Sequence, residues 1–167
     1  MKSKTSILFI ILCALSLVLF YYITEFFGTE LREISAVITQ ALLTFAGIAT
    51  ERNNTILRLG DMSFDIIPAC NGSTTLQVLF ISSLFLVLVN SKLNLARKIV
   101  CLMLSVPIAL LANGIRLALL VYASKVKGHV LAEGGLHYTI GVLGFLIGLT
   151  LLLLIFDLFS DKKDDEY

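Results

Sequence analysis

Residues 99–123 read IVCLMLSVPIALLANGIRLALLVYA, an apolar run interrupted by Pro107, Asn113 and Arg116. About 20 predominantly apolar residues are enough to cross a bilayer as a helix, so the run predicts a transmembrane helix. A charged side chain inside such a helix is costly and often marks a functional position. The run therefore predicts a membrane-embedded fold and points to Arg116 as a residue with a specific role.

The rest of the chain repeats this apolar pattern. Of its 167 residues, 57% are hydrophobic, whereas a typical soluble domain is about 45–50% apolar. The other long apolar runs cover about residues 7–27, 72–90 and 137–159. We therefore predict an all-α polytopic membrane protein, in which residues 1–167 form a single membrane-embedded domain in contact with lipid. The net charge of +1 gives no indication of nucleic-acid binding.

Residues 34–50 leave the number of spans open. This segment is shorter than the other runs, and its polar residues are Ser35, Thr39, Gln40 and Thr44. It is either an additional span or a helix that lies in the membrane interface. The chain accordingly has four transmembrane helices, or five if this segment crosses, and the basic N-terminus favours four.

A short β-hairpin is predicted before the second long run. Residues 51–69 are polar by comparison with the segments on either side. Within them, residues 57–59 and 64–66 alternate between apolar and charged side chains around Gly60-Asp61. Alternation on both sides of a turn-forming pair is typical of a hairpin. We expect this hairpin at the extracytoplasmic membrane surface, close before Cys70.

Basic residues predict how the spans are oriented. The short loop 91–98 carries Lys92, Arg97 and Lys98 and no acidic residue. Short loops rich in lysine and arginine stay on the cytoplasmic side of a membrane. Cys70 and His137 then lie at the outer ends of their helices, because one complete span separates each of them from this loop.

The same orientation places Arg116 near the outer boundary. It lies 17 residues beyond Ile99, and at about 1.5 Å per residue this is roughly 25 Å from the cytoplasmic edge. The hydrocarbon core of a bilayer is about 30 Å thick. Cys70, Arg116 and His137 are therefore predicted to lie in one outer layer.

A thiol, a guanidinium and an imidazole at one depth are the groups needed for acyl transfer through a cysteine. Cys70 would begin a helix, where the helix dipole and free backbone N–H groups stabilise a thiolate. Arg116 and those N–H groups could hold an oxyanion. His137 could take the proton from the thiol and return it to the leaving amine.

Further residues could support this site. Asn71, Ser73 or Thr74 could cap the helix that follows Cys70, and Gly72 would let a substrate chain approach closely. Asn113 lies one helical turn before Arg116 on the same face, where it could orient Arg116 or His137.

The residues alone also fit a non-catalytic membrane subunit. Arg116 would then bind an anionic lipid or a partner protein, and Cys70 would be structural. The carboxylates available to Arg116 are Asp61, Asp65 and Glu133. A metal or redox site at Cys70 and His137 is disfavoured, because two ligands make a poor site. We expect no cofactor, and three cysteines without a Cys-x-x-Cys pair indicate no disulfide framework.

Three short blocks occur in order along the chain. They are ACNGS at residues 69–73, PIALLANGIR at 107–116 and HYTIG at 137–141. The first follows the predicted hairpin and the last opens the final span. In this order and topology the blocks resemble the exosortase/archaeosortase family over roughly residues 50–145.

The resemblance implies a membrane cysteine protease or transpeptidase of a protein-sorting system, located in the cytoplasmic membrane of a prokaryote with its site facing outward. Its substrates would be exported proteins that end in a short motif, one transmembrane helix and a basic tail, and cleavage would proceed through a cysteine thioester. Cys70 would be the nucleophile, Arg116 the essential basic residue and His137 the third active-site residue. The family usually has Ser or Thr after the cysteine, where this chain has Asn71.

Overall fold

The computed structural model describes residues 3–90, 93–127 and 135–161 of the chain. Its helices are α1 (Ser3–Phe45), α2 (Ser73–Val89), α3 (Leu95–Lys127) and α4 (Gly135–Asp161), with a short 3-10 turn η1 (Pro68–Cys70). Its strands are β1 (Glu51–Asn53), β2 (Ile56–Leu59) and β3 (Met62–Asp65). All four α-helices are long and apolar enough to cross a membrane. The predicted class, a helical membrane protein with four spans and a small β-element, is confirmed.

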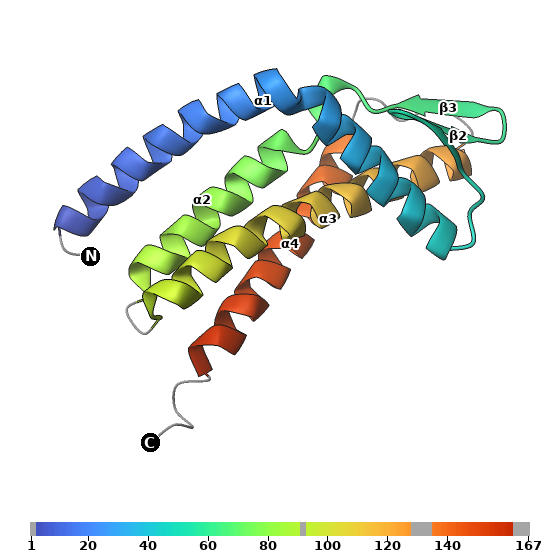
Figure 1. Ribbon diagram of the computed structural model, residues 1–167. Helices are drawn as coiled ribbons and strands as arrows, with labels where there is room; N and C mark the ends of the chain where they lie inside the picture. The colour runs from blue at the N-terminus through green and yellow to red at the C-terminus, as the bar shows by residue number, and fades with distance from the viewer. Residues whose placement is uncertain (1–2, 91–92, 128–134, 162–167) are drawn as a thin grey trace.

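Helix α1 contains two of the predicted segments in one kinked helix. A break was expected between residues 7–27 and 34–50, but the backbone stays helical to Phe45 except at Phe27, where φ is −118° and ψ is 17°. The kink turns the second half of α1 across the bundle (Figure 1). The predicted boundary is therefore a bend, and the described residues contain no separate fifth helix.

Two polar side chains in the second half of α1 face the protein interior. Ser35 and Thr39 are completely buried, and the Thr39 hydroxyl donates a hydrogen bond to the Ser35 carbonyl at 2.6 Å. A bond to the preceding turn removes most of the penalty for burying a hydroxyl group. Of the residues that weakened the apolar pattern of this segment, Ser35 and Thr39 are thus packing residues, whereas Thr44 is exposed.

Helices α2 and α4 both pack against α3. Leu79 on α2 and Ala112 on α3 are completely buried. Both lie close to Gly148 on α4, where an added Cβ would be 2.7 Å from Leu79 Cδ1 and 2.9 Å from Ala112 Cβ. Small residues allow such close approach between membrane helices. Towards the C-terminal end of α4, Arg97 Nη1 donates to the carbonyl of Phe159 at 3.1 Å, which fixes the start of α3 to α4.

The predicted hairpin is present and is extended by a third strand. Strands β2 and β3 are antiparallel with Leu57 opposite Phe64, and Gly60 supplies the positive φ of 60° at the turn. Strand β1 pairs with the other edge of β2. Its three residues are polar and exposed, so no alternation signalled it in the sequence. Leu57 and Phe64 form a buried cluster with Leu117 and Val121 of α3, which holds the sheet against that helix.

Arg32 on α1 also fixes the sheet. Its Nη2 lies 3.1 Å from Asp65 Oδ1 and donates to Thr55 Oγ1 at 3.3 Å. Its Nε donates to the carbonyl of Ile66. Asp65 is half exposed, so the ion pair alone contributes little to stability. Together the bonds position the segment that leads into η1 and α2.

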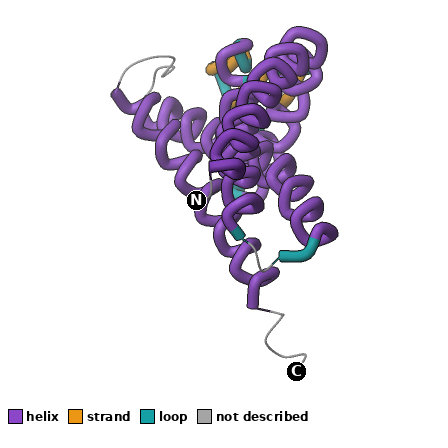
Figure 2. Tube along the Cα trace, turned by 90° about the vertical axis from the view of Figure 1, so that its left-hand side faces the viewer, coloured by secondary structure: helices purple, strands orange, loops and turns teal. Residues whose placement is uncertain are grey.

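The strands, η1 and the start of α2 gather at one end of the bundle, which we call the sheet end (Figures 1 and 2). The kinked half of α1, the last turns of α3 and the first turns of α4 lie at this end too. The C-terminal end of α4 lies at the opposite end, which we call the far end.

Gly114 should be essential for the packing of α1 on α3. An added Cβ there would overlap the Cγ2 atom of Ile38. We expect Gly114→Ala to lower the free energy of unfolding by about 1–3 kcal/mol through overpacking, despite the higher helix propensity of alanine. Gly28→Ala is the matched control, because its Cβ would meet Asn71 Nδ2 at an ordinary 3.9 Å. Equal thermal unfolding of the two variants in detergent would contradict this packing.

Candidate active site

Cys70 lies at the sheet end, as the last residue of η1 and just before α2. Its backbone N–H donates to the carbonyl of Ile67 at 2.8 Å. Its side chain is 7% exposed and belongs to the buried cluster beneath the sheet. No hydrogen bond reaches the thiol from any described residue. Cys70 therefore precedes a helix, as the sequence predicted, but it lies under the sheet rather than on an open surface.

The turn after Cys70 requires a glycine. Asn71 Oδ1 accepts a hydrogen bond from the Ser73 N–H at 2.9 Å, which satisfies one free N–H group at the start of α2. Gly72 has a positive φ of 87°. An added Cβ at Gly72 would lie 2.8 Å from Asn113 Nδ2. Gly72 thus allows Asn113 to approach the turn, whereas the sequence suggested that it makes room for a substrate.

Asn113 contacts the backbone that carries Cys70. Its Nδ2 donates to the carbonyl of Cys70 at 3.3 Å and to Ser35 Oγ at 3.0 Å. Ser35 Oγ in turn donates to the carbonyl of Asn71 at 3.1 Å. We call these groups the Ser35–Asn113 cluster. Asn113 was expected to orient Arg116 or His137, but among the described residues it donates to Ser35 and to the Cys70 carbonyl.

Ser35 is a site residue that the sequence analysis missed. Its only signal was a hydroxyl in an otherwise apolar segment, which we interpreted as a weakness of the predicted span. Its partners are 36 and 78 residues away in the chain, and no local pattern indicates contacts at that separation.

Arg116 and His137 are in direct contact. Arg116 Nη2 lies 3.0 Å from His137 Nε2. A guanidinium only donates hydrogen bonds, so Nε2 must accept, and a neutral imidazole then carries its proton on Nδ1. Nδ1 is buried and has no hydrogen-bond partner among the described residues. The resting arrangement therefore leaves His137 with one occupied and one free ring nitrogen.

Glycines of α4 make room for Arg116. An added Cβ at Gly144 would lie 2.8 Å from Arg116 Cβ, and one at Gly141 would lie 3.6 Å from Arg116 Nε. Of the carboxylates considered from the sequence, Asp65 pairs with α1, and Glu133 lies outside the described residues. Within the described ranges no ion pair neutralises Arg116, so its charge is available to an incoming anion.

His137 lines two hollows at the sheet end. The first, of about 120 Å³, lies under the sheet and is lined by both Cys70 and His137; we call it the thiol cavity. The second, of about 490 Å³, lies between α2 and α4 and is lined by Arg116, His137, Thr74 and Thr75; we call it the sheet-end hollow. The structure thus brings the three predicted residues together, with His137 between Cys70 and Arg116. In the described part of the chain, no hydrogen bond joins the thiol to Arg116 or His137.

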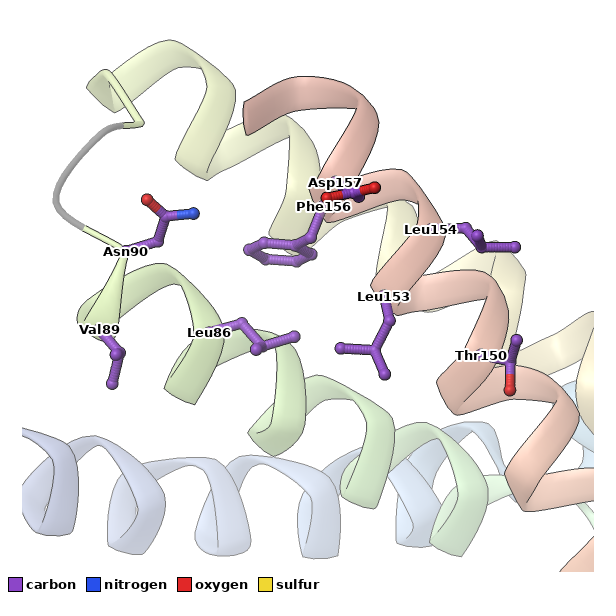
Figure 3. Close-up of a pocket in the computed structure, with 8 residues that line it drawn as sticks. All are labelled: Leu86, Val89, Asn90, Thr150, Leu153, Leu154, Phe156 and Asp157. Carbon is purple, nitrogen blue, oxygen red and sulfur yellow. The ribbon is translucent and has the colours of Figure 1, made fainter. Parts of the chain in front are cut away.

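A third hollow, of about 580 Å³, lies between α2 and α4 towards the far end (Figure 3). It is larger than the two hollows around His137, but no cysteine or histidine lines it. Volume alone therefore does not identify the reactive site. Within residues 3–90, 93–127 and 135–161, no group of three His, Cys, Asp or Glu side chains could hold a metal ion.

A comparison with models of protein families matches residues 2–154 to the model described as transmembrane exosortase (Exosortase_EpsH). No curated protein and no solved structure matches the chain. The matched region includes the sheet, most of the helical bundle and all the candidate site residues.

Gly72→Ala should damage the site more than the same change at Gly60. Both glycines have positive φ, 87° and 60°, so a Cβ costs about 1–2 kcal/mol of backbone strain at each. Nothing lies within 4 Å of a Cβ at Gly60, whereas the Cβ at Gly72 meets Asn113. We expect the Gly72→Ala variant to unfold in detergent at a lower temperature than the Gly60→Ala variant. We also expect a thiol reagent to alkylate Cys70 at an altered rate in the Gly72→Ala variant. Identical behaviour of the two variants would contradict the role of this contact.

Proposed function

The chain belongs to the transmembrane exosortase family, and from this membership we propose that it is a membrane cysteine peptidase or transpeptidase of a protein-sorting system. It is a multi-pass membrane protein. Its proposed substrates are exported proteins that end in a short motif, one transmembrane helix and basic residues. The observation that carries the proposal is the hydrogen bond between Arg116 and His137, beside the cavity that His137 shares with Cys70.

The proposed reaction takes place at the outer face of the cytoplasmic membrane. Arg97 and Lys98 lie in the first turn of α3, towards the far end, and basic residues near the ends of spans favour the cytoplasm. Lys92 of the same predicted loop lies outside the described residues. With this orientation the sheet end faces outward, where it would meet exported proteins whose C-terminal helix is still in the membrane.

Cys70 is the proposed nucleophile. It lies three residues before Ser73, where α2 begins, and the aligned peptide dipoles at a helix N-terminus favour a negative charge. The first N–H groups of a helix have no partner within the helix. The side chain of Asn71 already accepts from the Ser73 N–H, so the N–H groups of Thr74 and Thr75 are the ones available to a substrate oxygen beside the sheet-end hollow.

Arg116 is the proposed stabiliser of the oxyanion. Attack by the Cys70 sulfur on the scissile carbonyl carbon forms a C–S bond and places a negative charge on the carbonyl oxygen. A guanidinium in a site without bulk water stabilises such a charge strongly. Arg116 turns its N–H groups to the carbonyl oxygen when the substrate binds, so its hydrogen bond to His137 Nε2 is released before the sulfur attacks.

The release of Nε2 gives His137 its proposed role. Before the attack, the freed imidazole takes the proton of the Cys70 thiol and becomes an imidazolium, which leaves the thiolate as the nucleophile. Collapse of the tetrahedral intermediate then breaks the C–N bond, and the imidazolium gives its proton to the departing amine. The products of this step are a thioester on Cys70, a released peptide and a neutral His137.

The second half of the reaction reverses these proton transfers. An acceptor amine or water attacks the thioester carbonyl, and His137 takes a proton from the attacking group. The C–S bond breaks, and the proton passes from His137 to the Cys70 sulfur. The enzyme returns to its resting state, in which Arg116 again donates to His137.

Replacement of Cys70 should abolish processing and leave the fold intact. In cells, Cys70→Ala should accumulate the uncleaved substrate, and Cys70→Ser should be nearly inactive, because a serine hydroxyl ionises far less readily than a thiol. The measurement is an immunoblot of a tagged substrate precursor. Cys13→Ala is the control, because Cys13 lies on α1 and lines neither hollow at the sheet end. Normal processing by a stable, membrane-inserted Cys70→Ala would favour the non-catalytic subunit instead.

The His137→Gln variant should distinguish two roles of His137, its contact with Arg116 and its transfer of a proton. A glutamine oxygen can accept the hydrogen bond from Arg116 but cannot carry a proton to the leaving amine. We expect the rate of substrate cleavage to fall by about 10²–10⁴-fold, with unchanged thermal unfolding. Thr139→Ala, in the same turn of α4 but bonded only to the Gly135 carbonyl, should retain the full rate. A full cleavage rate in His137→Gln would refute its role in proton transfer.

A further inference from the structure

Helices α2 and α4 form one long groove along the side of the bundle. Both helices line the sheet-end hollow and also the hollow of about 580 Å³ towards the far end. Between the two hollows, Gly148 of α4 lies next to Leu79 of α2. We call the two hollows and this contact the α2/α4 groove.

Helical spacing places both hollows on the same face. The groove positions of α4 are three or four residues apart and all exposed: Tyr138, Val142, Leu146, Thr150, Leu153 and Asp157. Those of α2 follow the same spacing: Thr75, Val78, Ser82, Leu86 and Val89. Residues with this spacing form one stripe along a helix. The two hollows therefore lie in line on one side of the bundle, from the sheet end towards the far end.

The middle of the groove is apolar. The hydroxyl groups within it are bonded to their own helices, Thr150 to the Leu146 carbonyl at 2.8 Å and Ser82 to the Val78 carbonyl at 2.9 Å. Figure 3 shows Leu86 of α2 and Leu153 of α4 pointing toward each other across the far-end part of the groove. Such a surface suits an apolar helix, which brings no polar group that needs a partner.

Asp157 lies near the far end of the groove. Its side chain is exposed, and no hydrogen bond or ion pair joins it to another described residue. A carboxylate at the edge of an apolar span is costly unless it has a partner. It follows His137 by 20 residues, or about 30 Å of helix, which matches the hydrocarbon thickness of about 30 Å. The groove thus has the reactive imidazole at one membrane boundary and a free carboxylate at the other.

We propose that the α2/α4 groove docks the transmembrane helix of the substrate and that Asp157 pairs with the basic residues that follow this helix. The inference rests on the proposed function and specifies where the substrate binds. The apolar stripe is as long as an apolar helix that crosses the membrane, and the negative charge of the carboxylate is complementary to a basic tail. A lipid chain would also fit the apolar stripe, but an anionic head group would be repelled by Asp157.

Docking in this groove would make the position of cleavage depend on the length of the substrate helix. A helix held at Asp157 by its basic tail places its other end beside Arg116 and His137. The residues that follow that end then reach Cys70. The apolar length of the substrate helix would therefore decide which peptide bond is presented for cleavage.

Site-specific crosslinking in membranes tests this docking. The photoreactive residue p-benzoylphenylalanine replaces Leu153 in the full-length chain, in a Cys70→Ala background that prevents cleavage. The probe is an exported carrier protein followed by an apolar helix of about 20 residues and a tail of three lysines. We expect a crosslink from Leu153 but not from Met103, which is 66% exposed on α3 outside the groove.

The charge pair is tested with the same probe and with a second one that ends in three glutamines. Loss of one exposed charge pair should reduce the crosslink about two- to fivefold. We expect this reduction for Asp157→Asn with the lysine probe, and no effect of Asp157→Asn with the glutamine probe. Equal crosslinks from Leu153 and Met103, or equal crosslinks from both probes, would overturn the docking proposal. The crosslink needs no catalysis, so this result is independent of the processing assay on Cys70→Ala.

Discussion

The Ser35–Asn113 cluster is the interaction on which the geometry of the site depends. It joins α1, α3 and the turn after η1 through hydrogen bonds among buried groups. Where no water is available, each group relies on its protein partners. A typical hydrogen bond contributes about 1 kcal/mol, but a buried group left without its partner costs about 1–3 kcal/mol. The three elements can therefore meet in only one register, and that register sets the position of Cys70.

Helix α3 carries both halves of the site. Asn113 binds the backbone of the proposed nucleophile, and Arg116, one helical turn later, binds the imidazole of α4. Because residues three apart lie on neighbouring parts of a helix surface, α3 sets the spacing between Cys70 and His137. Gly72 and Gly144 allow the two neighbouring segments to approach these side chains. A small number of residues on one helix thus organises groups that are far apart in the sequence.

The sequence was informative wherever a pattern was local. Apolar length predicted the spans, alternation around Gly60 predicted the hairpin, and counting residues along a helix placed Arg116 at the level of His137. The sequence predicted a break between residues 27 and 34, because the largely polar residues 28–33 interrupt the apolar pattern, and it did not predict that the helix continues through a bend at Phe27. Ser35 and the partner of Asn113 were missed for a different reason. Their contacts depend on how helices cross, which is decided by packing between distant segments.

The burial of Cys70 has a consequence for the fate of an acyl-enzyme. Cys70 is 7% exposed and lies in a cluster of apolar side chains, so water would have little access to a thioester formed on it. A thioester formed there would hydrolyse slowly and persist until a stronger nucleophile arrived. The lifetime of this intermediate, more than the affinity for any acceptor, would then determine the share of product that is transferred to an amine instead of being lost to water.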